Sequence, residues 1–593
     1  METKRIILEE KFVDIQCLSD LGEALEKDGA PTVFLGKCNV ELSKLAYSEL
    51  GNVKKGEDEV AYLVYSDGKD LAVAFERDYY ESDAAGVCAL YYIRDAILRG
   101  DTFSEGVVTS GAVEPIAYCK SLDEKQNIAC YEKMRDQVGG SLGEEIVEAT
   151  KEYFSMMSGG VVDWLSGLYD PEIGGWYYSA SGRDHEGYLP DLESTGEALT
   201  ILQYNNMLDH VGGTKALPDF MKQQIISFIK PLQDPNGYFY HPQWTRERTD
   251  RLVERRARDL SYGVSALITA GGRPTYDTPT GIKGDGKLLD GTEVDPRGIE
   301  PAPKKTEEKK ADAAPKERYI SPILRDADSF RAYLEAGREK ITRAGYGFGS
   351  EISSLSSEIF NRDKQLVAEG KEGLADILMD FLTETQNPET GLWYSVKPDE
   401  EGYTIYSGVN ALLKIGGLFT MFGREFPHAL EACKSAVEAV YTDEDPLTMC
   451  YQYNAWFSIE NIIKNLLSQA KDPEWGKQKV DEIRAELLAD APASIRKTAE
   501  KLRKFRKDDG SFSYFQTGSC CTSNEMWVAI RDTNEGDVNA SVIGGIDVSD
   551  RMYFVLGIDR PKILGRAAYC KFIYNIKNPK PIIKKPAPYE IPR

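Results

Sequence analysis

One short turn motif recurs along this chain and constrains its fold more than any other feature. It reads DPEIGGWYY from Asp170, DPNGYFY from Asp234, NPETGLWYS from Asn387 and DDGSFSYF from Asp508. The first two copies lie about 64 residues apart and the last two about 121, close to two periods. Glycine in each turn provides a backbone conformation that other residues resist. A supersecondary unit repeated at commensurate spacing indicates a repeat architecture.

Helical segments surround these turns. Apolar residues recur at three- and four-residue spacing in each segment, the pattern of amphipathic helices; the segments are residues 143–168, 217–232, 326–343, 372–385, 428–441 and 477–505. Two Tyr-rich loops, near Ala344 and Asp445, precede apolar helices without the full turn. Six units of roughly 60 residues, each an outer helix, a turn and an inner helix, predict a mainly α chain with an (α/α)6 toroid.

The first part of the chain has a different pattern. Residues 32–37 predict a buried strand, residues 59–76 a hairpin that turns at 66–68, and residues 81–99 a helix. This order resembles the N-terminal accessory domain of several glycoside hydrolase families, and any other α/β cap is the alternative.

The expected domain layout follows. Residues 1–122 form the α/β domain, 123–575 the toroid and 576–593 a Pro/Lys-rich tail. Within the toroid, residues near 273–318 include a Pro-, Lys- and Glu-rich insertion that its composition predicts to be disordered.

Composition narrows the partners and the compartment. The formal net charge of -24 argues against duplex nucleic acid and anionic membranes, which need a basic face. No apolar run approaches the roughly 20 residues of a membrane span. Charged residues at the N-terminus do not suit a signal peptide, and the ten cysteines show no small-domain disulfide pattern. These features predict a cytoplasmic protein, while its oligomeric state stays open.

The candidate catalytic carboxylates come from the starts of the predicted inner helices, which should surround the toroid's pocket. They are Asp191, Glu193, Asp259 and Asp537, and Glu197 follows without an assigned role. Glycoside hydrolysis needs two carboxyl groups on opposite sides of the scissile bond. The alternative is that Asp191 caps a helix and that the negative charge of Glu193, in the first turn, interacts favourably with the helix dipole.

Six arginines lie between Arg246 and Arg258, and they suggest either a solvated helix face or a contact with an anionic sugar. With Tyr453 or His241 as a base and a cation or an amide such as Asn454 neutralising a carboxylate, the pocket would suit a polysaccharide lyase. Further polar and aromatic residues at the helix starts are candidate substrate contacts: His185, Tyr188, His241, Trp244, Arg255, Arg256, Tyr262, Tyr403, Tyr406, Asn410, Asn454, Asn524 and Asn539.

The most specific short motif is Cys520-Cys521-Thr-Ser-Asn524, which with Cys450 suggests a thiolate metal site. It resembles the (α/α)6 β-L-arabinofuranosidase family, which has a Cys-Cys-x-x-Asn motif and a further metal-binding cysteine upstream. The resemblance implies that Cys520 is a nucleophile and that Cys521 and Cys450 bind zinc. The family's glutamate two residues before the upstream cysteine is Thr448 here. The alternative is that the cysteines are structural thiols and that the protein needs no cofactor.

The leading hypothesis is a carbohydrate-active enzyme, a glycoside hydrolase that acts on oligosaccharides, with anionic oligosaccharides among the candidate substrates. A lyase that acts on uronates is the second hypothesis. A non-catalytic glycan-binding or scaffold protein is the third.

Overall fold

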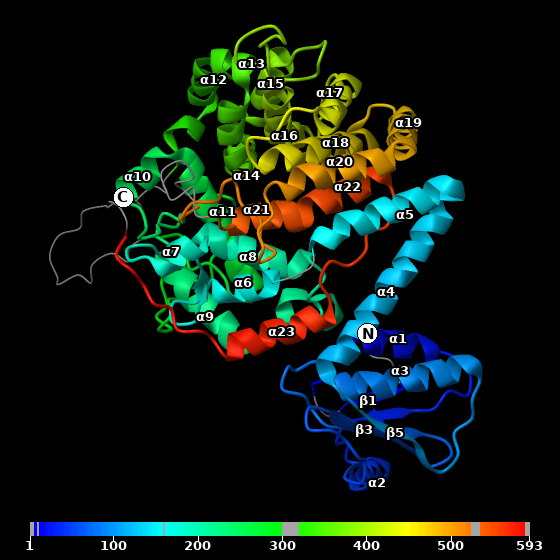
Figure 1. Ribbon diagram of the computed structural model, residues 1–593. Helices are drawn as coiled ribbons and strands as arrows, with labels where there is room; N and C mark the ends of the chain where they lie inside the picture. Colours follow the sequence, from blue (N-terminus) through cyan, green and yellow to red (C-terminus); the bar gives the residue numbers. More distant parts are fainter. Residues whose placement is uncertain (1–4, 9–10, 158–159, 299–319, 524–533, 588–593) are drawn as a thin grey trace, which may run out of the picture.

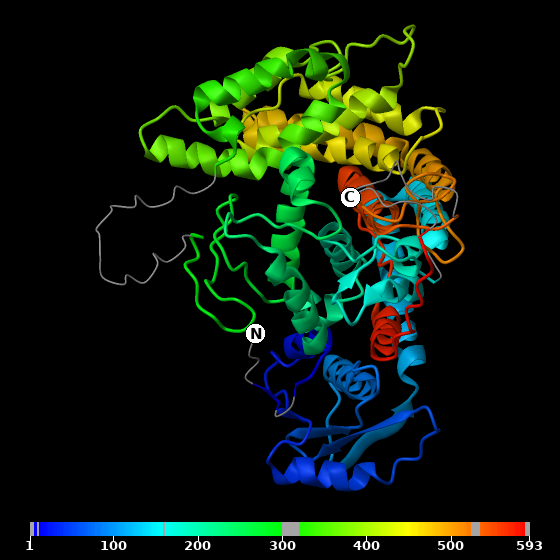
Figure 2. The same ribbon diagram turned by 90° about the vertical axis from the view of Figure 1, so that its left-hand side faces the viewer.

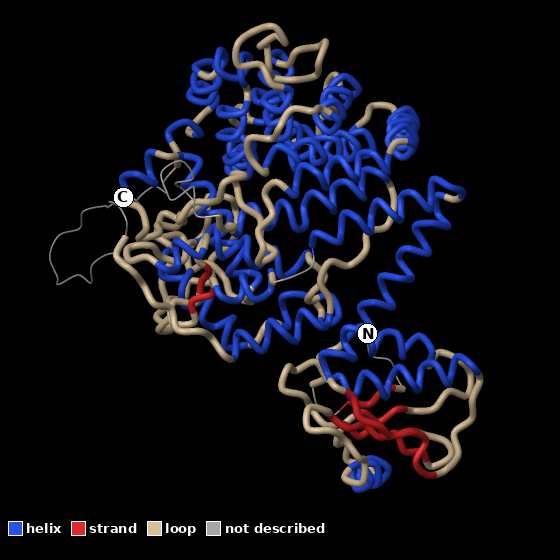
Figure 3. The backbone as a smooth tube through the Cα atoms, viewed as in Figure 1, coloured by secondary structure: helices blue, strands red, loops and turns tan. Residues whose placement is uncertain are grey.

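The computed structural model describes residues 5–8, 11–157, 160–298, 320–523 and 534–587. A small mixed sheet with its helices forms one end of the molecule, and a large helical body forms the rest (Figures 1 and 3). The predicted division into a small α/β part followed by a mainly helical part is confirmed. Among the described residues, no helix is both long enough and apolar enough to cross a membrane.

The N-terminal sheet has the strand order β1-β2-β4-β3-β5. Its strands are β1 (Ile6–Leu8), β2 (Val33–Leu35), β3 (Val60–Ser66), β4 (Leu71–Phe75) and β5 (Gly106–Val113). Strand β2 pairs in parallel with β1 and β4, whereas β3 pairs antiparallel with β4 and β5. The predicted strand at 32–37 and the hairpin at 59–76 are confirmed as β2 and β3–β4, while the two edge strands escaped prediction.

Three helices cover the two faces of this sheet: α1 (Ile15–Ala24), α2 (Glu41–Leu50) and α3 (Ala84–Arg99). Side chains of β4 alternate between the faces, so Leu71 and Val73 join the core under α1 and α3 while Ala72 and Ala74 join the core under α2. The predicted helix at 81–99 is α3, and it ends at Gly100, whose φ of 82° suits glycine.

Helix α4 (Pro115–Val138) crosses residue 122, the predicted domain boundary, and leads from the sheet to the helical body (Figure 2). It packs against α5 (Gly140–Phe154) and α23 (Arg566–Lys577). The end of the chain thus returns to the helix that joins the two parts.

Inner helical elements pack against one another in a cyclic order. They are α8 (Leu192–Tyr204), α11 (Val253–Thr269), α14 (Tyr346–Ala368), α16 (Ile405–Met421), α18 (Cys450–Gln469) and a last element built from α21 (Val538–Val542), the π-helical turn η6 (Ile543–Asp547) and α22 (Val548–Leu556). Each packs against the next, α22 packs on α18, and α21 packs on α8.

The remaining helices of the body lie outside this set. They are α6 (Val161–Gly167), α7 (Ala180–Asp184), α9 (Asp219–Ile229), α10 (Arg246–Arg251), α12 (Ala327–Ala336), α13 (Arg338–Ala344), α15 (Ala375–Thr385), α17 (Ala429–Tyr441), α19 (Pro473–Ala489) and α20 (Ala491–Arg503). Three segments predicted as single helices are each divided, and in the first of them, residues 143–168, α5 and α6 are separate helices. Gly337 separates α12 from α13, and Pro492, which has no N–H to continue a helix, begins α20 after α19.

The four copies of the turn motif share two local features. Gly174, Gly237, Gly391 and Gly510 all have positive φ, between 67° and 92°. The Asp or Asn near the start of each turn accepts a hydrogen bond of 2.9–3.0 Å from the N–H two residues later; these residues are Asp170, Asp234, Asn387 and Asp509. The glycine N–H donates to the carbonyl four residues earlier in the first and third copies, and to the carbonyl three residues earlier in the second and fourth. The repeated motif therefore folds into two related forms of turn.

Two of the turns are followed by a buried tryptophan that fixes the preceding helix. The indole N–H of Trp176 donates to the carbonyl of Leu165 in α6 at 3.1 Å. In the same way, Trp393 donates to the carbonyl of Leu382 in α15 at 3.0 Å. Carbonyls near a helix C-terminus lack intrahelical partners, so each tryptophan satisfies one of them and fills the core between helices.

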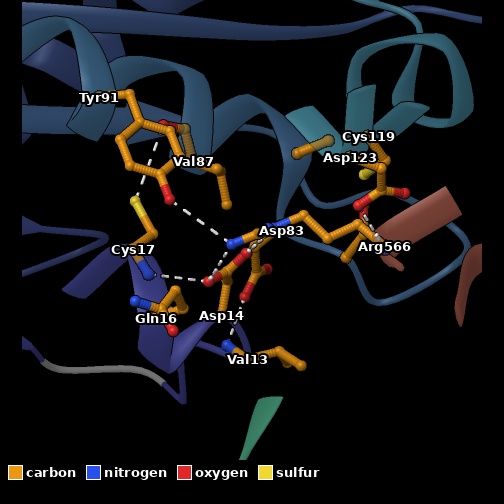
Figure 4. A network of polar contacts seen from close by, with 12 residues as sticks. Val13, Asp14, Gln16, Cys17, Asp83, Val87, Tyr91, Cys119, Asp123 and Arg566 are labelled. Carbon is orange, nitrogen blue, oxygen red and sulfur yellow. Dashed lines mark hydrogen bonds and ion pairs between the residues drawn. The ribbon is translucent and has the colours of Figure 1, made fainter. Parts of the chain in front are cut away.

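A buried ion pair ties α23 to the N-terminal part (Figure 4). Arg566 Nε lies 2.7 Å from Asp14 Oδ2, and both residues are almost fully buried. Asp14 also caps α1 through the N–H of Cys17 at 2.8 Å, while Asp123 of α4 accepts the N–H groups of Arg566 and Ala567. Because a buried charge without its partner is costly, this contact fixes where α23 begins.

We expect the turn at Gly391 to tolerate alanine poorly. Its φ is 67°, and a Cβ there would lie 2.4 Å from the backbone nitrogen of Ala432. Gly370 is a matched control, because its φ is 72° with nothing within 4 Å of the added Cβ. Gly370→Ala should cost about 1–2 kcal/mol from the left-handed backbone alone. Gly391→Ala should lower the Tm further in calorimetry, and equal Tm values for the two variants would contradict this account.

Candidate functional site

A cavity of about 260 Å³, called here the central cavity, lies among the inner helical elements. Every one of these elements contributes to its wall: Glu197 of α8, Tyr262 of α11, Tyr346 of α14, Lys414 of α16, Asn454 of α18 and Asp547 of η6. Residues from six separate parts of the chain therefore meet in one polar space.

Glu193 is the charged centre of one wall. Its two carboxylate oxygens each lie 2.7 Å from a guanidinium, Oε2 from Arg255 and Oε1 from Arg258. Burial would raise the pKa of Glu193, but Arg258 and Arg255 outweigh it and hold that pKa below its ordinary value. Glu193 is thus a carboxylate anion fixed between two cations, and it holds no proton to donate.

Glu197 lies one helical turn after Glu193 and has the opposite character. Its Oε1 accepts hydrogen bonds from Asn539 Nδ2 at 2.6 Å and from the Tyr262 hydroxyl at 3.3 Å. Its Oε2 is buried and has no hydrogen-bond partner among the described residues. Burial, followed by the nearby charge of Glu193, raises the pKa of Glu197 well above its ordinary value. A neutral carboxyl group whose second oxygen is unoccupied is arranged as a proton donor.

Asp547 is a second carboxyl group of the cavity with a raised pKa. It is the last residue of the π-helical turn η6, and such turns occur often at functional sites. Burial raises its pKa to about 7, against the lowering effect of Arg551. Arg551 lies 4.0 Å from Asp547 but contacts Glu460 more closely, at 2.9 Å. Asp547 can therefore exchange a proton near neutral pH.

Cations and tyrosines complete the wall. Lys414 is half-buried, and desolvation together with Arg258 lowers its pKa. Cys450 lies near these cations, yet burial still raises the pKa of its thiol to about 11. Tyr346 and Tyr514 also line the cavity. Flat aromatic faces beside carboxyl and amide groups suit a ligand that has both apolar ring faces and hydroxyl groups.

The structure brings a subset of the predicted site residues to this cavity: Glu193, Tyr262, Cys450, Tyr453, Asn454 and Asn539. The other predicted site residues that the structure describes lie outside the lining of the cavity.

Asp191 and Asp537 are helix caps. Asp191 Oδ1 accepts the N–H of Ser194 at 2.7 Å at the start of α8. Asp537 Oδ1 accepts the N–H of Ala540 at 2.7 Å at the start of α21, and its Oδ2 accepts from the Ser519 hydroxyl at 2.6 Å. Neither residue lines the cavity, so the capping alternative describes where the structure places them.

Asp259, Arg255, Trp244 and His241 form a buried layer outside the cavity lining. Arg255 Nη2 lies 2.7 Å from Asp259 Oδ1, and the Trp244 indole donates to Asp259 Oδ2 at 3.1 Å. Burial lowers the pKa of His241 to about 3, so this histidine is neutral at physiological pH. Arg256 lies nearby, with its guanidinium 4.9 Å from the centre of the Tyr238 ring.

Three predicted contacts of α16 and the preceding loop also lie outside the lining. The hydroxyl of Tyr406 accepts a hydrogen bond from Lys501 Nζ at 2.8 Å. Asn410 accepts from Asn454 Nδ2 at 2.6 Å and so orients a residue that does line the cavity. Tyr403 packs with its ring centre 6.1 Å from that of Tyr394.

His185 and Tyr188 lie under the C-terminal segment. Lys584 Nζ donates to the carbonyl of Tyr188 at 2.8 Å, and His185 forms an isolated bridge with Lys585. Asn524 lies outside the described residues.

The cysteines of the proposed metal site occupy two environments. Cys520 and Cys521 are buried, and Cys521 Sγ lies 3.3 Å from the Ser181 hydroxyl oxygen, whereas Cys450 lines the central cavity. Within the described part of the chain, no three His, Cys, Asp or Glu side chains are grouped so that they could hold a metal ion. The nucleophile and ligand roles of these cysteines therefore stay predictions.

The sequence reasoning assigned no site role to Glu197, Arg258, Lys414 or Asp547. Three of them lie about one helical turn after a predicted site residue: Glu197 four positions after Glu193, Lys414 four after Asn410 and Arg258 three after Arg255. Residues four apart share a helix face, and this spacing is the signal that would have found them. Asp547 lies two such steps after Asn539, and Ile543 between them also lines the cavity.

Comparisons with known proteins do not assign this chain to a family. The chain matches no protein-family model, and neither a curated protein nor a solved structure shows significant similarity to it. The residues of the central cavity are therefore the basis for proposing a function.

We expect Glu193→Gln to destabilise the fold. The substitution removes the charge that compensates two arginines, and loss of one partner from a buried ion pair costs about 3–5 kcal/mol. Glu247→Gln is the control, since Glu247 is an exposed first-turn acid of α10. Denaturant unfolding should shift strongly for Glu193→Gln and little for Glu247→Gln. If both variants unfold like the parent protein, Glu193 does not hold α8 against α11.

Proposed function

We propose that the cyclic order of inner helices is an (α/α)6 toroid and that the protein is a glycoside hydrolase, which cleaves an oligosaccharide in the central cavity. The observation that carries this proposal is the Glu197 carboxyl group, whose Oε2 has no partner among the described residues in a cavity lined by tyrosines and amides. Glycosidic oxygen is a poor leaving group unless it receives a proton, so such a carboxyl is the part that hydrolysis needs.

In this proposal Glu197 protonates the glycosidic oxygen. Asn539 and Tyr262 occupy Oε1 as donors, which leaves the proton on Oε2. Asp547, ionised above about pH 7, acts as the second carboxylate, either activating water or attacking the sugar. Lys414, which also lines the cavity, would bind negatively charged substituents, which leaves room for anionic oligosaccharides.

A uronate lyase is the second candidate, because Tyr453 lines the cavity together with Arg258 and Lys414. A lyase would need Tyr453 to act as a base. Burial raises the pKa of Tyr453 well above its ordinary value, which opposes its ionisation and favours the hydrolase. A lyase product would absorb ultraviolet light through its new double bond, whereas a hydrolase product would not.

The proposal also covers the N-terminal domain and the cellular compartment. The N-terminal sheet would be an accessory domain of the glycosidase type. All ten cysteines are free thiols, which supports a reducing compartment such as the cytoplasm.

We expect Glu197→Gln to lower kcat by about 10²–10⁴-fold, the usual contribution of a positioned general acid. Asp547→Asn should cause a loss of similar size, because amides neither donate nor accept the required proton. Release of reducing ends from a panel of oligosaccharides measures both, with Glu247→Gln as the control. A glycan-binding protein without catalysis would release no reducing ends in any of these forms, and full activity of Glu197→Gln would refute the mechanism.

The pH dependence of kcat/KM should be bell-shaped. Asp547 must lose its proton, so the rate should rise as the pH passes through about 7. Glu197 must keep its proton, so the rate should fall again at higher pH, above the raised pKa of that group. Initial rates between mildly acidic and alkaline pH measure both limbs. A rate that falls steadily through neutral pH would exclude Asp547 as the group that ionises.

A further inference from the structure

A larger opening, called here the outer groove, lies between α11 and α14 and has a volume of about 630 Å³. Six serines of the two helices line it: Ser261, Ser265, Ser353, Ser354, Ser356 and Ser357. None of the six hydroxyls makes a hydrogen bond with another described residue. Serine hydroxyls in helices often bond to the backbone of the preceding turn. Hydroxyls that make no such bond, on two facing helices, can donate to and accept from a ligand.

A buried carboxyl group at the wall of the outer groove points to a ligand independently of the serines. Glu358 is only 4% exposed, and its Oε2 accepts the Tyr238 hydroxyl at 2.5 Å. Its Oε1 is buried and has no hydrogen-bond partner among the described residues. Burial raises the pKa of Glu358, which favours the neutral acid. A buried polar atom without a partner costs free energy, and a ligand hydroxyl would recover it.

The outer groove meets the central cavity at two shared residues. Arg258 and Tyr262 line both spaces. Arg258 bonds to Glu193 at 2.7 Å and the Tyr262 hydroxyl lies 3.3 Å from Glu197, so these side chains form the partition between them. A ligand in the outer groove would therefore lie next to the proposed general acid.

We propose that the outer groove is a second saccharide-binding site, which takes a neutral oligosaccharide beside the catalytic cavity. The choice of a saccharide rests on the proposed function. Hydroxyl-rich walls match sugar hydroxyls, Glu358 offers a free carboxyl oxygen, and the volume lies within the roughly 300–1,000 Å³ of typical ligand sites. A neutral chain is favoured over an anionic one, because the charge of Arg258 is already paired with Glu193.

The test measures binding in a form that does not depend on turnover. Glu197→Gln protein is screened on an array of neutral and acidic oligosaccharides, and the best neutral binder is then titrated by calorimetry. Ser265→Trp and Ser357→Trp, each added to Glu197→Gln, place bulk at exposed positions of the outer groove, one on each helix. Ser468→Trp, at an exposed position of α18 away from the groove, is the matched control. Circular dichroism verifies that each variant is folded.

We expect each groove variant to weaken Kd for the neutral oligosaccharide by about tenfold or more, which is about 1.4 kcal/mol. The control variant should bind like its Glu197→Gln parent. The proposal is overturned if no neutral oligosaccharide binds, or if the folded groove variants bind as tightly as the control. Failure of the proposed function is seen separately, as full hydrolytic activity of Glu197→Gln, and leaves the groove affinities to decide this inference on their own.

Discussion

The enclosed contact of Glu193 with Arg255 and Arg258 is the interaction on which the rest of the site depends. It joins α8 to α11 and puts a fixed negative charge in the wall of the central cavity. That charge, together with burial, keeps the proton on Glu197 one turn away. The same ion pairs also hold Arg258 at the partition with the outer groove, so stability and proton chemistry have a common physical origin.

A division of roles runs along the inner helices. Polar residues at the helix starts satisfy backbone groups, as Asp191 and Asp537 do, because the first N–H groups of a helix lack internal partners. Polar residues further along the helix are not needed to bond the first N–H groups and can face the cavity, as Glu197 and Lys414 do. The proposed general acid Glu197 therefore lies in the second turn of α8 and not at its start.

Much of the fold was accessible from the sequence, while the site was accessible only in part. The turns at Gly174, Gly237, Gly391 and Gly510 depend on local backbone geometry, which a short motif specifies. The hairpin and the helix of the N-terminal part follow from local periodicity in the same way. Glu193 was predicted because it lies at a helix start, whereas Asp547 lies eight positions after Asn539, in a π-helical turn far from the helix start.

The sequence by itself determined the repeated turns, the helical body and the small α/β beginning, because these result from interactions between residues close in the chain. Only the tertiary structure decided which polar groups are paired and which are left unpaired. Asn539 bonds to Glu197 from 342 positions away, and Ser523 bonds to Asp191 from 332 positions away. A carboxyl group becomes a cap, an ion-pair partner or a proton donor according to such distant neighbours and its burial, since these set its pKa and its free oxygens.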